Sequence, residues 1–386
     1  MDNRAPREPG TMPLPAVTST SNAACCSSER PALDSVRIVG MSAEWMQEWA
    51  ALEVRLRSSY LTCSHVWTQT WLKHYGDLVP HRLAVATHAG EVVGMCLITN
   101  GVQQYDGPFE IKTLHIGTAG EPEPESVCVE YNRLLVASEF RSPFVRQLTH
   151  WITKRETCEC LLVEGIVAEE SQDFLNCDTP TVVQEVPSHY CDLNLFRAAP
   201  SEPWRLFGES TRTNLRRSLR DLGDLQVDWA DEPQVALQLF DEMIGYHQAR
   251  WNAAGKPGVF SSDRFRFFHR DLIETLVPQQ RAVLVRVREQ RRVIGILYLL
   301  IEQNRLWYYQ GGLPDHQSKH SLGNVTQYLA MLEGARRGYD AFDFLAGDDQ
   351  YKRVLSTHHN VVYWIRWRRP SLKFRLLDGL RSLRKR

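Results

Sequence analysis

The chain lacks three features, and each absence argues against a class of protein. Its 45 Lys and Arg balance 46 Asp and Glu, so no broad basic surface for nucleic acid is expected. No apolar stretch opens residues 1–34, which are rich in Pro, Ser, Ala and Thr; this argues against a signal peptide or membrane span and predicts a disordered tail. The nine scattered cysteines have no zinc-binding spacing. We therefore expect a cytoplasmic protein without a metal site.

The composition that is present suits a soluble globular protein, with 43% hydrophobic and 24% charged residues. A length of 386 residues favours two domains. We place them at 35–185 and 186–370, followed by a basic tail at 371–386. Trp67, Trp71 and Tyr75 recur at helical spacing on one face, where they either pack in the core or form a ligand cage.

A similar order of elements occurs twice along the chain. Each half is predicted to contain helices followed by a β-hairpin, at 82–88 with 92–99 and at 283–288 with 293–301. This order favours an internal duplication. The other predicted elements are strands at 36–40, 109–116 and 159–165 and helices at 43–57, 142–153 and 263–276.

Residues 210–223 are predicted to form a helix with one basic and one buried face. Arg212, Arg216 and Arg220 lie on the basic side. Ser210 or Thr211 is the expected N-cap, and Gly223 follows the last turn. The basic face either binds an anion such as a phosphate or is simply solvated.

Residues 305–352 are the most informative stretch. A strand at 305–312 leads through a polar loop to a helix capped by Ser321, which ends near Gly338 and is followed by a strand at 341–345. The start of such a helix presents free N–H groups that favour a pyrophosphate. Gly323 would let the phosphate approach the backbone closely, and Lys319 and His320 would add positive charge.

The run SLGNVTQYLAMLEGARRGYDAFDFLAGDDQYK at 321–352 resembles the branch of the GNAT superfamily that contains the CelD/BcsL-like acetyltransferases of cellulose biosynthesis. STRTNLRRSLRDL and HQARWNAAGKPGVF resemble further segments of that branch. The tandem layout is similar to that of FemAB-type transferases. The resemblance implies an α/β (α+β) fold of tandem GNAT-like domains, each a mixed, mostly antiparallel sheet flanked by helices.

The resemblance also implies a function: transfer of an acetyl or other acyl group from acyl-CoA to an amine or hydroxyl acceptor, in exopolysaccharide or cell-envelope biosynthesis. The C-terminal half would hold the cofactor and the chemistry, and the N-terminal half would shape the acceptor cleft without a cofactor. Two alternatives stay open, namely a FemAB-like aminoacyl transferase that uses aminoacyl-tRNA and a non-catalytic scaffold.

Roles for individual residues follow from this chemistry and from the resemblance. Asp348 and Asp349 are candidates for the general base, with a pKa raised by their like charges, or they brace the turn. Tyr351 would donate to the leaving thiolate, and Lys352 would contact the phosphates or pair with Asp348. The expected cofactor-binding residues are Lys319, His320, Ser321, Leu322, Gly323 and Asn324. The expected substrate-binding residues are Arg212, Arg216, His247, Arg250, Trp251 and Tyr309.

The last sixteen residues, 371–386, carry six Lys or Arg against one Asp. Leu372, Leu376, Leu380 and Leu383 recur at helical spacing, and Phe374 and Leu377 widen the apolar stripe. This amphipathic helix either packs on the second half or lies peripherally on an anionic inner-membrane surface.

Overall fold

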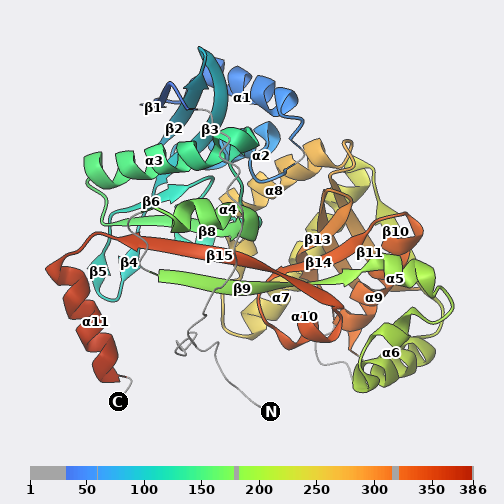
Figure 1. Cartoon of the computed structure of the whole chain (residues 1–386). Helices are drawn as coiled ribbons and strands as arrows, with labels where there is room; N and C mark the ends of the chain where they lie inside the picture. The colour runs from blue at the N-terminus through green and yellow to red at the C-terminus, as the bar shows by residue number, and fades with distance from the viewer. Residues whose placement is uncertain (1–31, 59, 178–181, 315–320, 385–386) are drawn as a thin grey trace, which may run out of the picture. The chain divides into compact units, whose positions relative to one another are not determined.

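The computed structural model describes residues 32–58, 60–177, 182–314 and 321–384. Most of the predicted disordered tail, together with Lys319 and His320, lies outside these ranges. Residues 32–386 form one compact unit. Its centre is a long sheet to which both halves of the chain contribute (Figure 1).

The described residues form a 13-stranded sheet and a small two-stranded one. The strands of the large sheet in spatial order are β1 (Ser35–Val39), β2 (His81–His88), β3 (Glu91–Asn100), β6 (Thr113–Ile116), β8 (Cys160–Val167), β15 (His358–Arg368), β9 (Val182–Asp192), β14 (Ala341–Ala346), β13 (Arg305–Gly312), β12 (Arg292–Glu302), β11 (Ala282–Glu289) and β10 (Leu225–Ala230). The remaining strands are β7 (Leu135–Val136), which pairs with β3, and the pair β4 (Tyr105–Asp106) and β5 (Phe109–Glu110).

The strand order is the same from either edge to the centre. In each half an edge strand pairs with a hairpin, and then come two strands that are parallel to each other, β6 with β8 and β13 with β14. The other strand pairs of the sheet are antiparallel, which confirms the predicted mixed, mostly antiparallel architecture. The arrangement agrees with the predicted duplication.

The two halves exchange their innermost strands. β15, from the end of the chain, pairs with β8 of the first half, whereas β9 pairs with β14 of the second half. β15 and β9 pair with each other and so join the halves. The boundary predicted at residue 185 falls inside β9.

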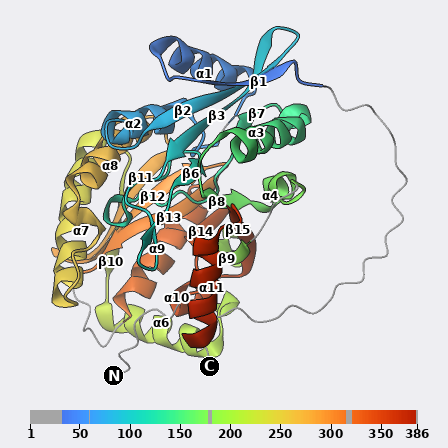
Figure 2. The same cartoon turned by 90° about the vertical axis from the view of Figure 1, so that its left-hand side faces the viewer.

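Helices cover both faces of the sheet (Figure 2). They are α1 (Ala43–Arg55), α2 (His65–Tyr75), α3 (Arg141–Arg155), α4 (Ala168–Leu175), α5 (Leu193–Ala198), α6 (Glu209–Leu222), α7 (Pro233–Ala253), α8 (Asp263–Leu276), α9 (Leu322–Arg336), α10 (Gln350–Val354) and α11 (Leu372–Arg384). No helix among the described residues is long and apolar enough to span a bilayer.

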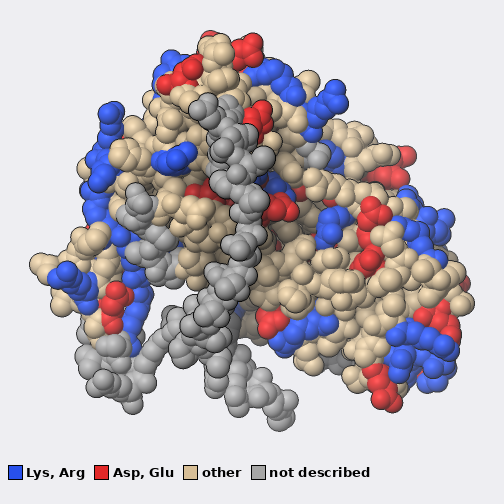
Figure 3. Space-filling view, viewed as in Figure 1, with Lys and Arg blue, Asp and Glu red and all other residues tan. Residues whose placement is uncertain are grey.

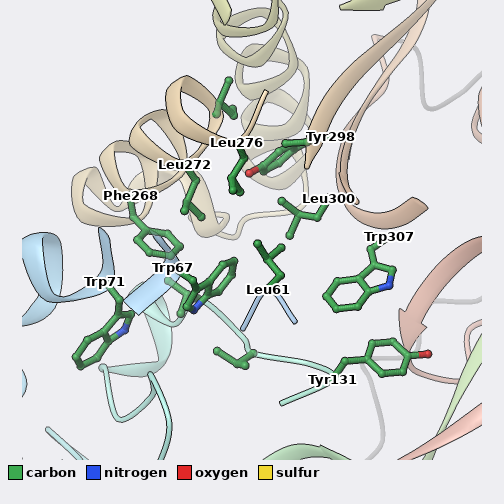
Figure 4. Close-up of a cluster of buried hydrophobic side chains, with 14 of the residues drawn as sticks. Leu61, Trp67, Trp71, Tyr131, Phe268, Leu272, Leu276, Tyr298, Leu300 and Trp307 are labelled. Atoms are coloured by element: carbon green, nitrogen blue, oxygen red, sulfur yellow. The ribbon is translucent and has the colours of Figure 1, made fainter. Parts of the chain in front are cut away.

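One hydrophobic core joins the two halves through α2 and α8 (Figure 4). The rings of Trp67 and Phe268 meet edge to face with centroids 5.2 Å apart. Trp71 and Tyr75 lie in the same cluster and are fully buried. The aromatic stripe at 67–75 is therefore part of the core, as one of the two interpretations predicted.

Two predicted caps differ from the structure. Gly208 is the N-cap of α6, so neither Ser210 nor Thr211 has that role. Ser321 does occupy the N-cap position of α9, but its side chain makes no capping hydrogen bond. Gly223 follows α6 with a φ of 75°, a conformation that glycine adopts without steric cost.

The apolar stripe predicted for the C-terminal helix divides into two faces in α11. Phe374 and Leu377 are buried against Ile111, whereas Leu372 and Leu376 are 76% and 63% exposed. The helix docks through the i, i+3 pair of Phe374 and Leu377, so its exposed leucines point away from the contact.

Candidate functional site

The candidate site lies where two parallel strands of the second half separate. β13 and β14 pair only from Arg305–Trp307 to Ala341–Asp343. The register of β12 with β13 then shifts next to Tyr309, which leaves this residue out of the ladder. α9 follows β13 along the chain, and α10 follows β14. Residues of the first turns of both helices line the same cavity.

A cavity of about 320 Å³ lies between α6, α9 and α10. Its polar lining consists of hydroxyl and amide side chains: Ser210, Thr211, Asn214 and Ser218 from α6, Ser321 and Asn324 at the start of α9, and Gln350 and Tyr351 from α10. No carboxylate of the described residues lines it. A cavity with hydrogen-bonding groups and no negative charge suits an anionic ligand.

The start of α9 opens toward this cavity. The first N–H groups of a helix lack partners within the helix, and Ser321 supplies no capping bond. Ser321 and Asn324 line the cavity, as predicted for the cofactor site. Leu322 is buried in the core, so only its backbone is available to a ligand.

Gly323 is not among the residues that line this cavity. A Cβ built on Gly323 would lie 3.3 Å from the Cδ1 of Leu313. The role of Gly323 in cofactor binding stays a prediction that rests on its backbone N–H.

Arginine side chains gather over α6 (Figure 3, lower right). Arg212 is half-buried and Arg216 is exposed. Within the described ranges neither of the two forms an ion pair, whereas Arg220 is 3.3 Å from Asp221. Arg212 and Arg216 therefore keep their charge available to an anion, and Arg220 is partly neutralised.

Tyr351 reaches the cavity from α10. Its ring packs edge to face on Phe344, with centroids 6.1 Å apart. Burial raises the pKa of the Tyr351 hydroxyl well above its ordinary value. The hydroxyl is therefore neutral at pH 7 and can donate a hydrogen bond, although burial makes it a weaker acid than an exposed tyrosine.

Lys352 neither pairs with Asp348 nor lines the cavity, contrary to the prediction. Its side chain is only 7% exposed, and Nζ donates to the carbonyl oxygens of Leu345, at 3.2 Å, and Ala346. Burial lowers the pKa of Lys352. Leu345 and Gly347 have φ angles of 61° and 127°, so Lys352 stabilises a turn in an unfavourable backbone conformation.

Glu130 from the first half holds the same turn. Its carboxylate accepts the N–H of Ala346, and burial raises its pKa to about 7. The turn that carries the two aspartates is therefore fixed from both sides.

The two aspartates of the turn differ. Asp348 accepts hydrogen bonds from His189 Nε2, at 3.0 Å, and from Arg353, at 2.7 Å, and these partners lower its pKa. The prediction of a raised pKa is wrong for Asp348, because the hydrogen bonds and charges of His189 and Arg353 outweigh the effect of desolvation. Asp349 is exposed at the N-cap of α10, and its side chain makes no capping bond.

Three of the residues predicted to bind substrate, His247, Trp251 and Tyr309, are engaged in contacts within the protein. His247 Nε2 accepts the indole N–H of Trp251 at 2.9 Å, and the His247 ring packs on Phe260. The hydroxyl of Tyr309 donates to the carbonyl of Val127. None of the three lines the cavity between α6, α9 and α10.

Arg250 is exposed on α7, and its positive charge opposes the burial-driven rise in the pKa of Tyr351 and Tyr308. Arg250 does not line the cavity between α6, α9 and α10. Its role in substrate binding stays a prediction.

Sequence reasoning missed the polar stripe of α6. Thr211, Asn214 and Ser218 lie between its arginine and leucine faces and form one wall of the cavity. Their spacing of three and four residues was the available signal. The sequence pattern instead predicts anion binding by the arginine face of the same helix.

Comparisons with known proteins agree with this location. Residues 209–353, which contain α6, α9 and most of α10, match the acetyltransferase (GNAT) domain family. Comparison with curated protein sequences finds no match. The similar solved structures include that of FemX, with a TM-score of 0.52 and 12% identity over 85% of this chain and 96% of that one.

Two further solved structures are also similar. L-PGS from Bacillus licheniformis has a TM-score of 0.52 and 11% identity, covering 88% of this chain and 96% of that one. The C-terminal domain of a putative lysylphosphatidylglycerol synthetase from Agrobacterium fabrum has a TM-score of 0.50 and 10% identity, covering 84% and 91%. At such identities the likeness shows the fold alone, and the chain has a GNAT-type fold.

Proposed function

We propose that this chain, which has the GNAT fold, is an acyltransferase that binds acyl-CoA in the cavity between α6, α9 and α10. The observation that carries the proposal is the cavity itself, which lies at the start of α9 inside the stretch that matches the GNAT domain. The acceptor is an amine or a hydroxyl.

Charge supports an anionic donor at this place. The first turn of α9 offers N–H groups and the positive end of the helix dipole, which favour a pyrophosphate. Arg212 and Arg216 add positive charge from α6, and the lining contains no carboxylate to repel the phosphates. The side-chain hydroxyl and amide groups would hydrogen-bond the rest of the donor.

The reaction needs a base and a proton donor near the thioester. The acceptor attacks the thioester carbonyl carbon, a C–N or C–O bond forms, and the C–S bond breaks. Asp349 is the better candidate to take the acceptor proton, because the basic partners of Asp348 weaken it as a base. Tyr351 would protonate the departing thiolate.

Two finer predictions stay open. Aminoacyl-tRNA is the alternative donor implied by the FemAB-type layout, and a role in exopolysaccharide or cell-envelope synthesis rests on the CelD/BcsL resemblance. Both are tested by offering the purified chain each donor and a panel of saccharide and amine acceptors.

Acetyl-transfer assays on single variants test the proposed roles. Asp349→Asn should lower turnover on the order of 100-fold, the usual contribution of a positioned base. Asp348→Asn, the matched control, should have a much smaller effect. Tyr351→Phe should lower kcat without weakening acetyl-CoA binding. Failure of acetyl-CoA to bind or to raise the melting temperature would contradict the proposal and favour a scaffold or another donor.

A further inference from the structure

A second cavity lies in the first half, where its own parallel strands separate. β6 and β8 pair only from Thr113–His115 to Cys160–Leu162. Beyond that point a cavity of about 220 Å³ opens, lined by residues of the 115–132 region, by Glu164 and by Trp364 of β15. It shares no lining residue with the cavity between α6, α9 and α10.

This second cavity is acidic. Three glutamates line it, Glu121, Glu123 and Glu164, and no lysine or arginine of the described residues does. His115 is 3% exposed and is held at both ring nitrogens, by Glu164 at 2.9 Å and by Thr113 at 3.0 Å. Even a protonated His115 would neutralise only one of the three carboxylates.

Glu121 is the most deeply buried of these glutamates, with 4% of its surface exposed. The indole N–H of Trp71 donates to its Oε1. The Glu121 side chain lines the cavity, and its carboxylate forms no ion pair with a cation of the described residues. Burial raises the pKa of Glu121 to about 7, as expected for a carboxylate without a cationic partner.

The walls of the cavity are built by specific hydrogen bonds. The Asn132 amide donates to the carbonyl oxygens of Ile116 and Glu164, each at 3.1 Å, and so bridges the separated strands. Gln104 donates to the carbonyl of Glu121 at 3.2 Å. Such bonds fix the shape of the cavity in the absence of a ligand.

We propose that this cavity binds the ammonium group of a small amine. The carboxylates would repel an acyl-CoA or any other anion, whereas an ammonium group would supply the missing partner of Glu121. The aromatic ring of Trp364 adds a surface that favours a cation. The described residues contain no group of three or more His, Cys, Asp or Glu suited to a metal ion, so an organic cation is the better fit.

The size of the cavity limits the ligand. At about 30 Å³ per water, a volume of about 220 Å³ corresponds to about seven water molecules, the size of a monosaccharide or a short diamine. The proposal does not depend on the acyltransferase function, because the two cavities are separate.

Calorimetry on the full chain tests the proposal with two matched pairs of probes at pH 8. These are 1,4-diaminobutane with 1,4-butanediol and D-glucosamine with D-glucose. At least one amine should bind, and its neutral partner should not. Glu121→Gln keeps the acceptor for Trp71 but removes the charge, and it should weaken amine binding at least tenfold. Glu91→Gln, an exposed glutamate in the same half, should leave binding unchanged.

A second variant keeps the test valid if Glu121→Gln is unstable. Ser126 lines the cavity, and Ser126→Phe should fill it and abolish amine binding. The proposal is overturned if neither amine binds, if the neutral probes bind equally well, or if folded Glu121→Gln and Ser126→Phe bind like the unsubstituted chain. Acetyl-CoA binding, measured on the same samples, reports separately on the proposed acyltransferase.

Discussion

Each half of the molecule contains a cavity, and the two cavities have different linings. Hydroxyl and amide side chains line the cavity between α6, α9 and α10 in the second half. Three glutamates line the cavity beside β6 and β8 in the first half. The two halves thus share a strand order, while their side chains give the two cavities a different charge.

The first half also shapes the site of the second. Its segment 127–131 reaches across the sheet, where Glu130 binds the turn after β14 and Tyr131 donates to the buried carboxylate of Asp343 at 2.7 Å. Arg305 pairs with the same carboxylate at 2.9 Å. We therefore expect that neither half folds or acts as a separate unit, which is testable by expressing them apart.

Filling the donor cavity should have the largest effect. Asn214→Trp places an indole into the cavity from an exposed position on α6. We expect acetyl-CoA affinity to fall on the order of 100-fold, about 2.7 kcal/mol, in calorimetric titrations. Thr213→Trp on the same helix is the control, because Thr213 is exposed and does not line the cavity. Equal affinities for the two variants would place the donor elsewhere.

Removing the unpaired arginines should have an intermediate effect. The double variant Arg212→Gln, Arg216→Gln should weaken acetyl-CoA about tenfold, or about 1.4 kcal/mol, because exposed charges are screened. The loss should shrink as salt is added. Arg220→Gln should bind normally, since Arg220 already pairs with Asp221. A salt-independent loss would argue against a charge effect.

The acidic cavity should make stability depend on pH. Burial raises the pKa of Glu121 from its ordinary 4.5 to about 7, so the folded chain retains a proton that the unfolded chain releases. This contribution favours folding at low pH and is lost as the pH rises from 4.5 through 7. Glu121→Gln should therefore raise the melting temperature at pH 8 more than at pH 5. The opposite order would show that Glu121 has a cationic partner.

The smallest effect is expected at α11. Its exposed Leu372 and Leu376 could enter the headgroup region of an anionic membrane, but Lys373 and Arg381 already pair with Glu159 and Asp106. We expect a several-fold weaker co-sedimentation with anionic liposomes at low salt for Leu372→Gln, Leu376→Gln. Val235→Gln, which removes another exposed apolar side chain, is the control. If the unsubstituted chain, the double leucine variant and Val235→Gln sediment identically, α11 does not contact the membrane through these leucines.

Local sequence patterns predicted individual helices and strands. They did not predict contacts between residues that are far apart in the sequence. The strand at 305–312 and the helix at 263–276 have the predicted bounds, because alternation and capping are local signals. The exchange of β9 and β15 between the halves leaves no local signal in the sequence. The hydrogen-bond partners of Lys352, Asp348 and His247 leave none either, because they are set by the tertiary structure.

The acidic cavity could not be predicted for a related reason. Its lining comes mainly from the irregular chain between β6 and β8, where hydrophobic periodicity is absent. Glu121 has the same local sequence context whether it is solvated or buried under Trp71. Only the packing of α2 against this segment determines which applies.

Hydrogen–deuterium exchange of the full chain with and without acetyl-CoA tests the central claim most directly. We predict that acetyl-CoA slows exchange in residues 210–218, 321–325 and 350–354 and leaves residues 115–132 unchanged. Protection confined to residues 115–132, or absent from the start of α9, would contradict the assignment of the donor to the cavity between α6, α9 and α10.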